Sequence, residues 1–134
     1  MLYIFMPIIA WIIAGSMKFL LNYIRFGNQA RSMIGYGGFP STHTTIMSSV
    51  VFLAGFRNGF ETSLFSLGLG ALLIVVIDAH GLRRKVGEQA HIINNMQDKT
   101  ILRERIGHSW SEILGGFVLG ILIAYGGFIV AGGV

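Results

Sequence analysis

The segment Gly37-Gly-Phe-Pro-Ser-Thr-His43 combines residue types that can bind an anion and transfer a proton. It lies where a polar loop gives way to an apolar run. Pro40 and the hydroxyls of Ser41 and Thr42 are signals for the start of a helix, and a helix N-terminus offers free N–H groups and partial positive charge to an anion. His43 adds an imidazole, which can donate a proton near neutral pH.

A second histidine stands at the start of another apolar run, in the segment Gly107-His108-Ser-Trp-Ser-Glu112. His108 and Glu112 are four residues apart and therefore share one face of a helix. A carboxylate in that position can orient an imidazole and raise its nucleophilicity, although the same spacing is found in surface ion pairs and in carboxylates at helix N-termini. Two histidines at two helix starts, with arginines between them, indicate phosphoryl transfer.

Cations near the end of the first apolar segment could bind a phosphate. Lys18 lies inside this segment, where it either binds phosphate or extends to the membrane interface. Arg25 follows seven residues later on the same helix face, and Arg31 comes after it. Both arginines could instead anchor the helix at the interface.

Charged residues also close the third apolar segment. Asp78 lies within an apolar run, so its carboxylate needs a cationic partner such as Lys18 or Arg83. The adjacent Arg83 and Arg84 offer rigid bidentate forks to phosphate oxygens. Basic residues are also common at the boundary of a membrane span.

The composition is that of an integral membrane protein. Of the 134 residues, 53% are hydrophobic and 12% are charged, and the mean hydropathy of +0.67 is far above that of soluble domains. The 19 glycines fit close packing of helices in lipid. The absence of cysteine excludes disulfides and thiolate metal sites. The net charge of +4 arises from basic residues beside apolar spans, which favours a membrane surface or phosphate over nucleic acid.

The apolar segments predict an all-α fold, an integral membrane bundle of about four transmembrane helices in a single domain spanning residues 1–134. The spans are predicted at residues 2–24, 41–57, 62–82 and 108–133. The second is at the short end of the spanning range. Residues 58–61 are predicted to form a turn, and the charged residues 83–107 a largely helical, amphipathic, cytoplasmic segment.

This topology places every candidate residue at one membrane face. The loop at residues 25–40, the end of the third span and the segment 83–107 all lie on the same side. Nine of the ten Lys and Arg residues are there, and only Arg57 is opposite. The positive-inside rule therefore predicts that the site faces the cytoplasm.

Arranged in this way, the motifs resemble those of the phosphatidic acid phosphatase superfamily, the membrane lipid phosphatases related to vanadium haloperoxidases. The resemblance is closer to a small divergent branch found in bacteria and plastids, and it covers roughly residues 14–125. The Gly-Gly-Met-Pro-Ser-Ser-His motif of that branch is matched by residues 37–43, and its Leu-Gly-His-x-x-x-Glu motif by residues 106–112. Its Asp-Ala-x-Gly-Val-Arg-Arg-x-x-Gly-x-Gln-Ala motif is matched by residues 78–90, and Asn94 fits a frequent asparagine after it.

The resemblance implies a metal-independent lipid phosphatase that uses no cofactor. His108 would attack the phosphorus and form a phosphohistidine, Glu112 would orient His108, and His43 would protonate the leaving alkoxide. The phosphoryl oxygens would be bound by cations, a hydroxyl and backbone N–H groups, namely Lys18, Ser41, Arg83 or Arg84, and the backbone near Gly38.

The chain departs from the wider superfamily in three respects. Lys18 and Arg25 keep the spacing of a Lys…Arg-Pro motif, but Phe26 replaces the proline, which leaves Arg25 a supporting role. Arg103 is one residue out of register with the arginine that precedes the superfamily's histidine, which would leave its role to the Arg83/Arg84 pair. The superfamily core usually has six helices, so a core of about four would leave the site wide and open to lipid, or completed by a second copy of the chain.

The sequence therefore predicts hydrolysis of a phosphomonoester or pyrophosphate of a lipid. Phosphatidylglycerol phosphate, phosphatidic acid and isoprenyl phosphates are the candidate substrates, and no feature of the sequence separates them. The alternatives are a non-catalytic membrane protein that binds phosphate or lipid, and a small transporter subunit. The presence of both His43 and His108 argues against the first alternative, and charges gathered at one face rather than along a pore argue against the second.

Overall fold

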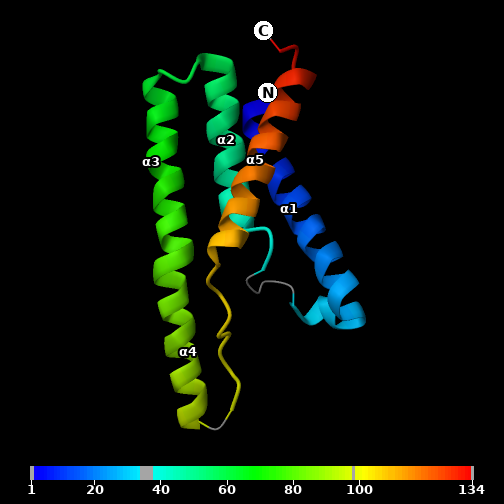
Figure 1. The fold of residues 1–134 in the computed structure, drawn as a ribbon, viewed down its shortest axis with the longest axis vertical. Helices are drawn as coiled ribbons and strands as arrows, with labels where there is room; N and C mark the ends of the chain where they lie inside the picture. Colours follow the sequence, from blue (N-terminus) through cyan, green and yellow to red (C-terminus); the bar gives the residue numbers. More distant parts are fainter. Residues whose placement is uncertain (1, 34–37, 98, 134) are drawn as a thin grey trace.

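The computed structural model describes residues 2–33, 38–97 and 99–133, and the regular structure of these residues is entirely helical (Figure 1). The helices are α1 (Leu2–Phe26), which ends in a short 3-10 helix (Gly27–Met33), α2 (Thr42–Asn58), α3 (Ser63–Ile77), α4 (Arg83–Gln97) and α5 (Trp110–Val130). A π-helical turn, η2 (Asp78–Leu82), joins α3 to α4. The predicted all-α fold is confirmed.

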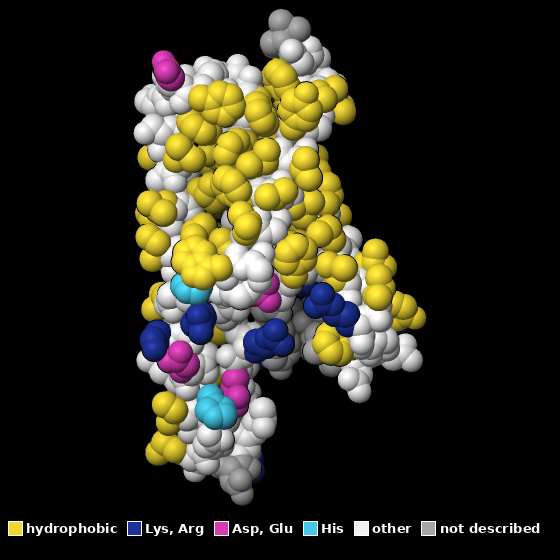
Figure 2. All heavy atoms as spheres, in the orientation of Figure 1, with side chains coloured by type: hydrophobic (Ala, Val, Ile, Leu, Met, Phe, Trp, Pro, Cys, Tyr) yellow, Lys and Arg dark blue, Asp and Glu magenta, His cyan; other side chains and the backbone are white. Residues whose placement is uncertain are grey.

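Among the described residues, three helices are long and apolar enough to cross a membrane, within Tyr3–Arg31, Ser63–Gln97 and Trp110–Val130. Most of the large hydrophobic side chains of these helices are exposed, as expected for surfaces that face lipid. Figure 2 shows hydrophobic side chains covering the upper part of the molecule and charged side chains gathered in its lower part. The predicted membrane bundle is therefore confirmed.

The second predicted span, α2, differs from the other three predicted spans. It has 17 residues and is too short to count among the candidate spans. It packs against α1, α3 and α5, and its buried positions include Thr44, Thr45, Ser48 and Ser49. The hydroxyls of Thr45 and Ser48 donate hydrogen bonds to carbonyls one turn earlier in the helix. Because α2 is enclosed by its neighbours and its hydroxyls are satisfied, it does not need an apolar surface.

A short hairpin joins α2 to α3, at the turn predicted from Asn58 and Gly59. Gly59 has φ of 93°, which an L side chain rarely adopts. Thr62 caps α3 by accepting a hydrogen bond from the Phe65 N–H at 3.2 Å. The ring of Phe60 packs edge-on against that of Phe65, with centroids 5.0 Å apart. The hairpin is therefore held by a cap and an aromatic contact.

A stripe of small residues on α5 allows close contact with α2. Gly116, Gly120 and Ala124 are four residues apart and buried. A Cβ placed on Gly120 would overlap the Ser48 hydroxyl and lie 2.6 Å from the carbonyl oxygen of Thr45. Spacing of this kind lets two backbones approach closely in lipid.

We expect Gly120→Ala to destabilise the bundle by about 1–3 kcal/mol, because the new methyl meets backbone that cannot rotate away. Gly126→Ala on the same helix is the matched control, since a Cβ there meets nothing within 4 Å. Thermal unfolding in detergent would measure both variants. Equal midpoints for the two variants would contradict the proposed packing.

The charged segment 83–107 is helical over its first 15 residues, as α4. Through η2, α4 continues α3 as one long rod, and residues 99–109, the return segment, run back along it without regular structure towards α5 (Figure 1). The largely helical segment that we predicted is therefore corrected for residues 99–107. A charged helix can end here because side chains of α4 supply hydrogen bonds to the returning backbone.

Asn94, which is buried on α4, makes most of these bonds. Its side-chain oxygen accepts hydrogen bonds from the N–H groups of Ile101 and Leu102, at 3.0 and 2.9 Å. Its amide group donates to the carbonyl of Leu102 and to the Glu104 carboxylate. Hydrogen bonds from Asn94 and His91 hold the pKa of Glu104 below its usual value. These side chains attach the return segment to α4.

Two glycines of the motifs lie where the return segment meets the rod. A Cβ on Gly87 would overlap the carbonyl oxygen of Glu104, and one on Gly107 would overlap the side chain of Arg84. The return segment therefore lies directly against the helix, and this contact places His108 beside η2.

Candidate active site

Five of the predicted site residues line a single cavity of about 900 Å³: Lys18 from α1, His43 from α2, Asp78 from η2, Arg83 from α4 and His108 from the return segment. They come from all three sequence motifs and from the first apolar segment. The cavity therefore brings together two imidazoles, two cations and one carboxylate.

The remaining wall of the cavity is largely apolar. α1 contributes most of it, and the 3-10 helix, α2, η2, α4 and the return segment contribute the rest. The apolar lining residues are Trp11, Ile12, Phe19, Ala30, Ile46, Leu82, Val86 and Ile106. An amphiphilic ligand could place a charged head beside the cations and a hydrocarbon part along this wall.

The sequence analysis did not assign several polar residues that line the cavity. Ser16 and Asn22 come from α1, and Thr42 from the first turn of α2. A signal for the first two was present, because Ser16 and Asn22 are, with Lys18, the polar exceptions in an apolar helix. Asn22 is four residues after Lys18 and shares its helix face, whereas the position of Ser16, two residues before Lys18, does not follow from this spacing.

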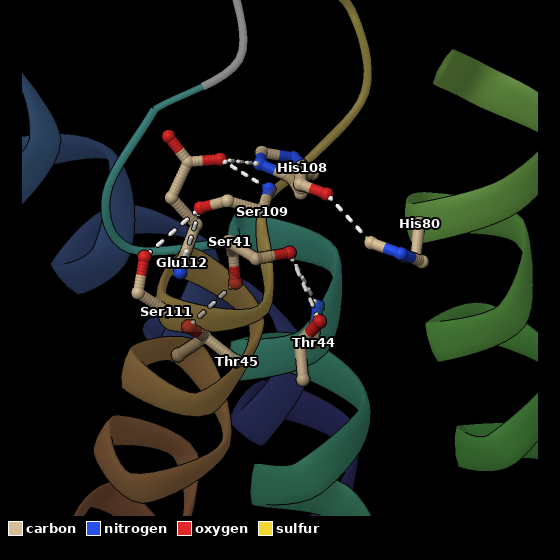
Figure 3. Close-up of polar contacts among 8 residues, drawn as sticks. All are labelled: Ser41, Thr44, Thr45, His80, His108, Ser109, Ser111 and Glu112. Carbon is tan, nitrogen blue, oxygen red and sulfur yellow. Dashed lines mark hydrogen bonds and ion pairs between the residues drawn. The ribbon is translucent and has the colours of Figure 1, made fainter. Parts of the chain in front are cut away.

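His108 is buried, with 4% of its surface exposed, and its ring is held by Glu112. Nδ1 of His108 lies 3.2 Å from Oε2 of Glu112 (Figure 3). The same oxygen accepts a hydrogen bond from the Ser109 N–H at 2.9 Å, and the Ser109 hydroxyl accepts one from the Glu112 N–H. This capping box fixes Glu112 at the start of α5. Because an ionised carboxylate only accepts, it favours the tautomer with the proton on Nδ1 and a lone pair on Nε2.

The π-helical turn decides which arginine reaches the cavity. The Arg83 N–H donates to the carbonyl of Asp78, five residues earlier, and the Arg83 Nε donates to the Asp78 carboxylate. This pair lines the cavity. The neighbouring Arg84 lines a different pocket, between α4, the return segment and the start of α5. The structure therefore places Arg83 and not Arg84 beside His43.

Ser41 is fully buried and does not line the cavity. It caps α2, and its hydroxyl lies 2.9 Å from the Thr44 hydroxyl. Its backbone N–H donates to the carbonyl of Glu112 at 2.9 Å, which joins the starts of α2 and α5. This geometry gives Ser41 a structural task, in place of the phosphate contact that the sequence predicted.

Two further predicted site residues, Gly38 and Arg25, are not among the residues that line the cavity. Gly38 lies close to Lys18, since a Cβ on Gly38 would be 3.9 Å from the Lys18 Cε. Gly37, the first residue of the motif, is outside the described residues. Arg25 is exposed and is not among the residues that line the cavity, although it shares a helix face with Lys18.

Comparison with known proteins agrees with this arrangement of motifs. The model of a family described as the divergent PAP2 family matches residues 2–123. The chain is also similar to an uncharacterised membrane protein of Bacillus subtilis (strain 168), YuiD, with 28% identity over 107 residues that cover 65% of this chain and 68% of the relative. No solved structure matches the chain.

Proposed function

Because this chain belongs to the divergent PAP2 family of membrane proteins, we propose that it is a lipid phosphatase that forms a phosphohistidine at His108. The observation that carries the proposal is the cavity in which a buried, carboxylate-bound histidine faces a second histidine and two cations. A phosphoryl group requires positioning and charge neutralisation more than covalent chemistry, and these residues supply both.

In the first step, the Nε2 lone pair of His108 attacks the phosphorus of the lipid phosphate. A P–N bond forms while the bond between phosphorus and the lipid oxygen breaks. The departing oxygen takes a proton from protonated His43. Lys18 and Arg83 neutralise the nonbridging oxygens, and Glu112 stabilises the positive charge that develops on the His108 ring.

In the second step, water attacks the phosphorus from the side that the lipid oxygen has left. Neutral His43 takes a proton from this water, the P–N bond breaks, and its electron pair returns to Nε2 of His108. Inorganic phosphate is released, and both histidines regain their starting protonation states. No metal ion is needed to balance these steps.

The apolar wall of the cavity supports a lipid-anchored substrate over a soluble one. Phosphatidylglycerol phosphate, phosphatidic acid and isoprenyl phosphates or diphosphates all combine a hydrocarbon part with the phosphoryl group that the cations would bind. We further propose that the site faces the cytoplasm. In the predicted topology, nine of the ten Lys and Arg residues lie on the same side of the membrane as the site, and such residues are enriched on the cytoplasmic side.

Release of inorganic phosphate by the purified protein in liposomes would test the proposal. Phosphatidylglycerol phosphate, phosphatidic acid and a polyprenyl diphosphate would be offered separately, with the His108→Ala variant as the control. We expect the wild type to release phosphate from at least one of them and the variant from none. Binding of vanadate or phosphate without release from any lipid would instead support a non-catalytic phosphate-binding protein.

The pH dependence of kcat/KM should reflect the burial of His108 and its contact with Glu112. Burial lowers the pKa of the His108 imidazole, and the hydrogen bond to Glu112 raises it in part. Because only the neutral ring can attack, kcat/KM should stay high as the pH falls below the ordinary histidine pKa of about 6.5. Glu112→Gln should move the acid limb to still lower pH, because it removes the group that raises this pKa.

Steady-state kinetics across pH would measure the shift. Glu88→Gln, at an exposed α4 carboxylate paired with Lys85, is the matched control and should leave the acid limb in place. An acid limb that moves upwards in Glu112→Gln would contradict the assigned contact.

A further inference from the structure

His80 lies in the π-helical turn and contacts the backbone of His108 from outside the cavity. Nδ1 of His80 is 3.3 Å from the carbonyl oxygen of His108 (Figure 3). The same ring lies against the indole of Trp110, with centroids 4.4 Å apart and an angle of 34° between the planes. Since a carbonyl oxygen only accepts hydrogen bonds, Nδ1 of His80 must be the donor.

The turn that contains His80 holds both backbone groups of His108. The N–H of His108 donates to the carbonyl of Ala79 at 3.0 Å, and its carbonyl accepts from His80. The return segment has no regular structure of its own at this point. Its position at His108 therefore depends on these two bonds to η2 and on the ring contact with Glu112.

We propose that His80 is a positioning residue for the phosphoryl transfer at His108, an inference that rests on the function proposed above. Trp110, the first residue of α5, fixes the plane of the His80 ring, and that ring fixes the His108 carbonyl. The turn also carries Asp78, which pairs with Arg83. One turn of helix thus sets the nucleophile and the phosphate-binding cation relative to each other.

The motif does not assign this role. His80 occupies the position that the Asp-Ala-x-Gly pattern leaves open, so the inference concerns this chain and comes from its contacts. Small displacements of a nucleophile have large effects on rate, because attack requires an aligned approach to phosphorus.

Two substitutions separate the hydrogen bond from the ring contact. His80→Phe keeps an aromatic ring against Trp110 and removes the donor. His80→Asn removes the ring and keeps an N–H donor on the atom that follows Cγ, where Nδ1 stands in histidine. His91→Phe, at an exposed histidine of α4, is the matched control for the first exchange.

We expect His80→Phe to lower kcat about tenfold on the lipid substrate, with KM within about twofold and an unchanged thermal midpoint. His80→Asn should retain kcat within about threefold of wild type, and His91→Phe should leave it unchanged. A wild-type kcat in His80→Phe would overturn the inference. A loss that tracks the fraction of folded protein in both His80 variants would also overturn it.

Binding of orthovanadate to the same proteins separates this inference from the proposed function. Vanadate can bond to a nucleophilic nitrogen in the geometry of the transition state, so its affinity measures how His108 is placed without turnover. If wild type binds vanadate but hydrolyses no lipid, weaker binding in His80→Phe and not in His80→Asn would support the positioning role while the phosphatase proposal fails. Equal vanadate affinity in all variants would overturn the positioning role, and a wild type that does not bind vanadate would overturn both.

Discussion

Replacing His108 with alanine is expected to reduce phosphate release by at least about 10⁴-fold, the largest effect of any single substitution in the cavity. The loss should be this large because the substitution removes the attacking nitrogen, and the second imidazole of the cavity, His43, is needed as the proton donor. Glu112 accepts a hydrogen bond from the ring of His108, and it does not line the cavity, so it is not placed to replace the ring as the nucleophile. Binding of substrate should change little, since Lys18 and Arg83 remain in the cavity.

Single-turnover kinetics with a lipid labelled in its phosphoryl group would measure this loss and search for the intermediate. After a rapid quench in base, wild-type protein should carry label that is labile to acid, as expected for a phosphoramidate. His91→Ala is the matched control, because its exposed ring contacts Glu104 outside the cavity. Residual turnover within tenfold of wild type in His108→Ala would exclude His108 as the nucleophile.

Replacing His43 with alanine is expected to slow hydrolysis of a natural lipid phosphate by about 10²–10⁴-fold, the contribution of a general acid. An alkoxide is a poor leaving group and needs a proton as the bond to phosphorus breaks. The same variant should lose much less activity towards an aryl phosphate such as p-nitrophenyl phosphate, because the phenolate is stable without protonation. The effect of the substitution should therefore depend on the leaving group.

The ratio of kcat/KM on the two substrates, measured for wild type and variant, would test this role. Thr42→Ala is a suitable control, since Thr42 is the neighbouring residue and also lines the cavity but carries no titratable group. It should lower both rates by similar factors. Equal losses on both substrates in His43→Ala would count against the general-acid role and would favour a role in phosphate binding.

The grouping of the site residues could be predicted from the sequence because it depends on two robust signals. Hydropathy placed the ends of the apolar segments at one face, and the motifs supplied Lys18, His43, Asp78 and His108. The structure brings these four side chains to one cavity. The contact between His108 and Glu112 was also predicted, but from a shared helix face that the structure does not have. His108 lies before the N-cap of α5, and the capping box at Ser109 brings Glu112 to its ring.

The choice between Arg83 and Arg84 could not be made from the sequence. In a regular α-helix, with 3.6 residues per turn, residues five apart point in well-separated directions. The π-helical turn closes hydrogen bonds between residues five apart, and so it brings Arg83 beside Asp78. Local composition does not show where such a turn will form.

The burial of Ser41 could not be predicted from the sequence for a related reason. Its position before a helix predicts a cap, and a cap can either leave its hydroxyl facing an anion or bury it among neighbouring helices. Contact with α5, through the bond to the Glu112 carbonyl, selects burial. Such a contact joins residues far apart in the chain, and the local pattern contains no information about it.

The enclosure of α2 has a consequence for the biogenesis of the protein. A translocon selects segments by their apolarity, and the hydroxyl-rich α2 is shorter and less apolar than the helices of the candidate spans. The turn at Gly59–Thr62 joins it to the strongly apolar α3, and the ring of Phe60 packs against Phe65 across that turn. We therefore expect insertion of α2 to be coupled to that of α3, with the two helices entering the bilayer together as a hairpin. On this expectation, α2, which carries His43, would insert into the membrane only after α3 has been synthesised.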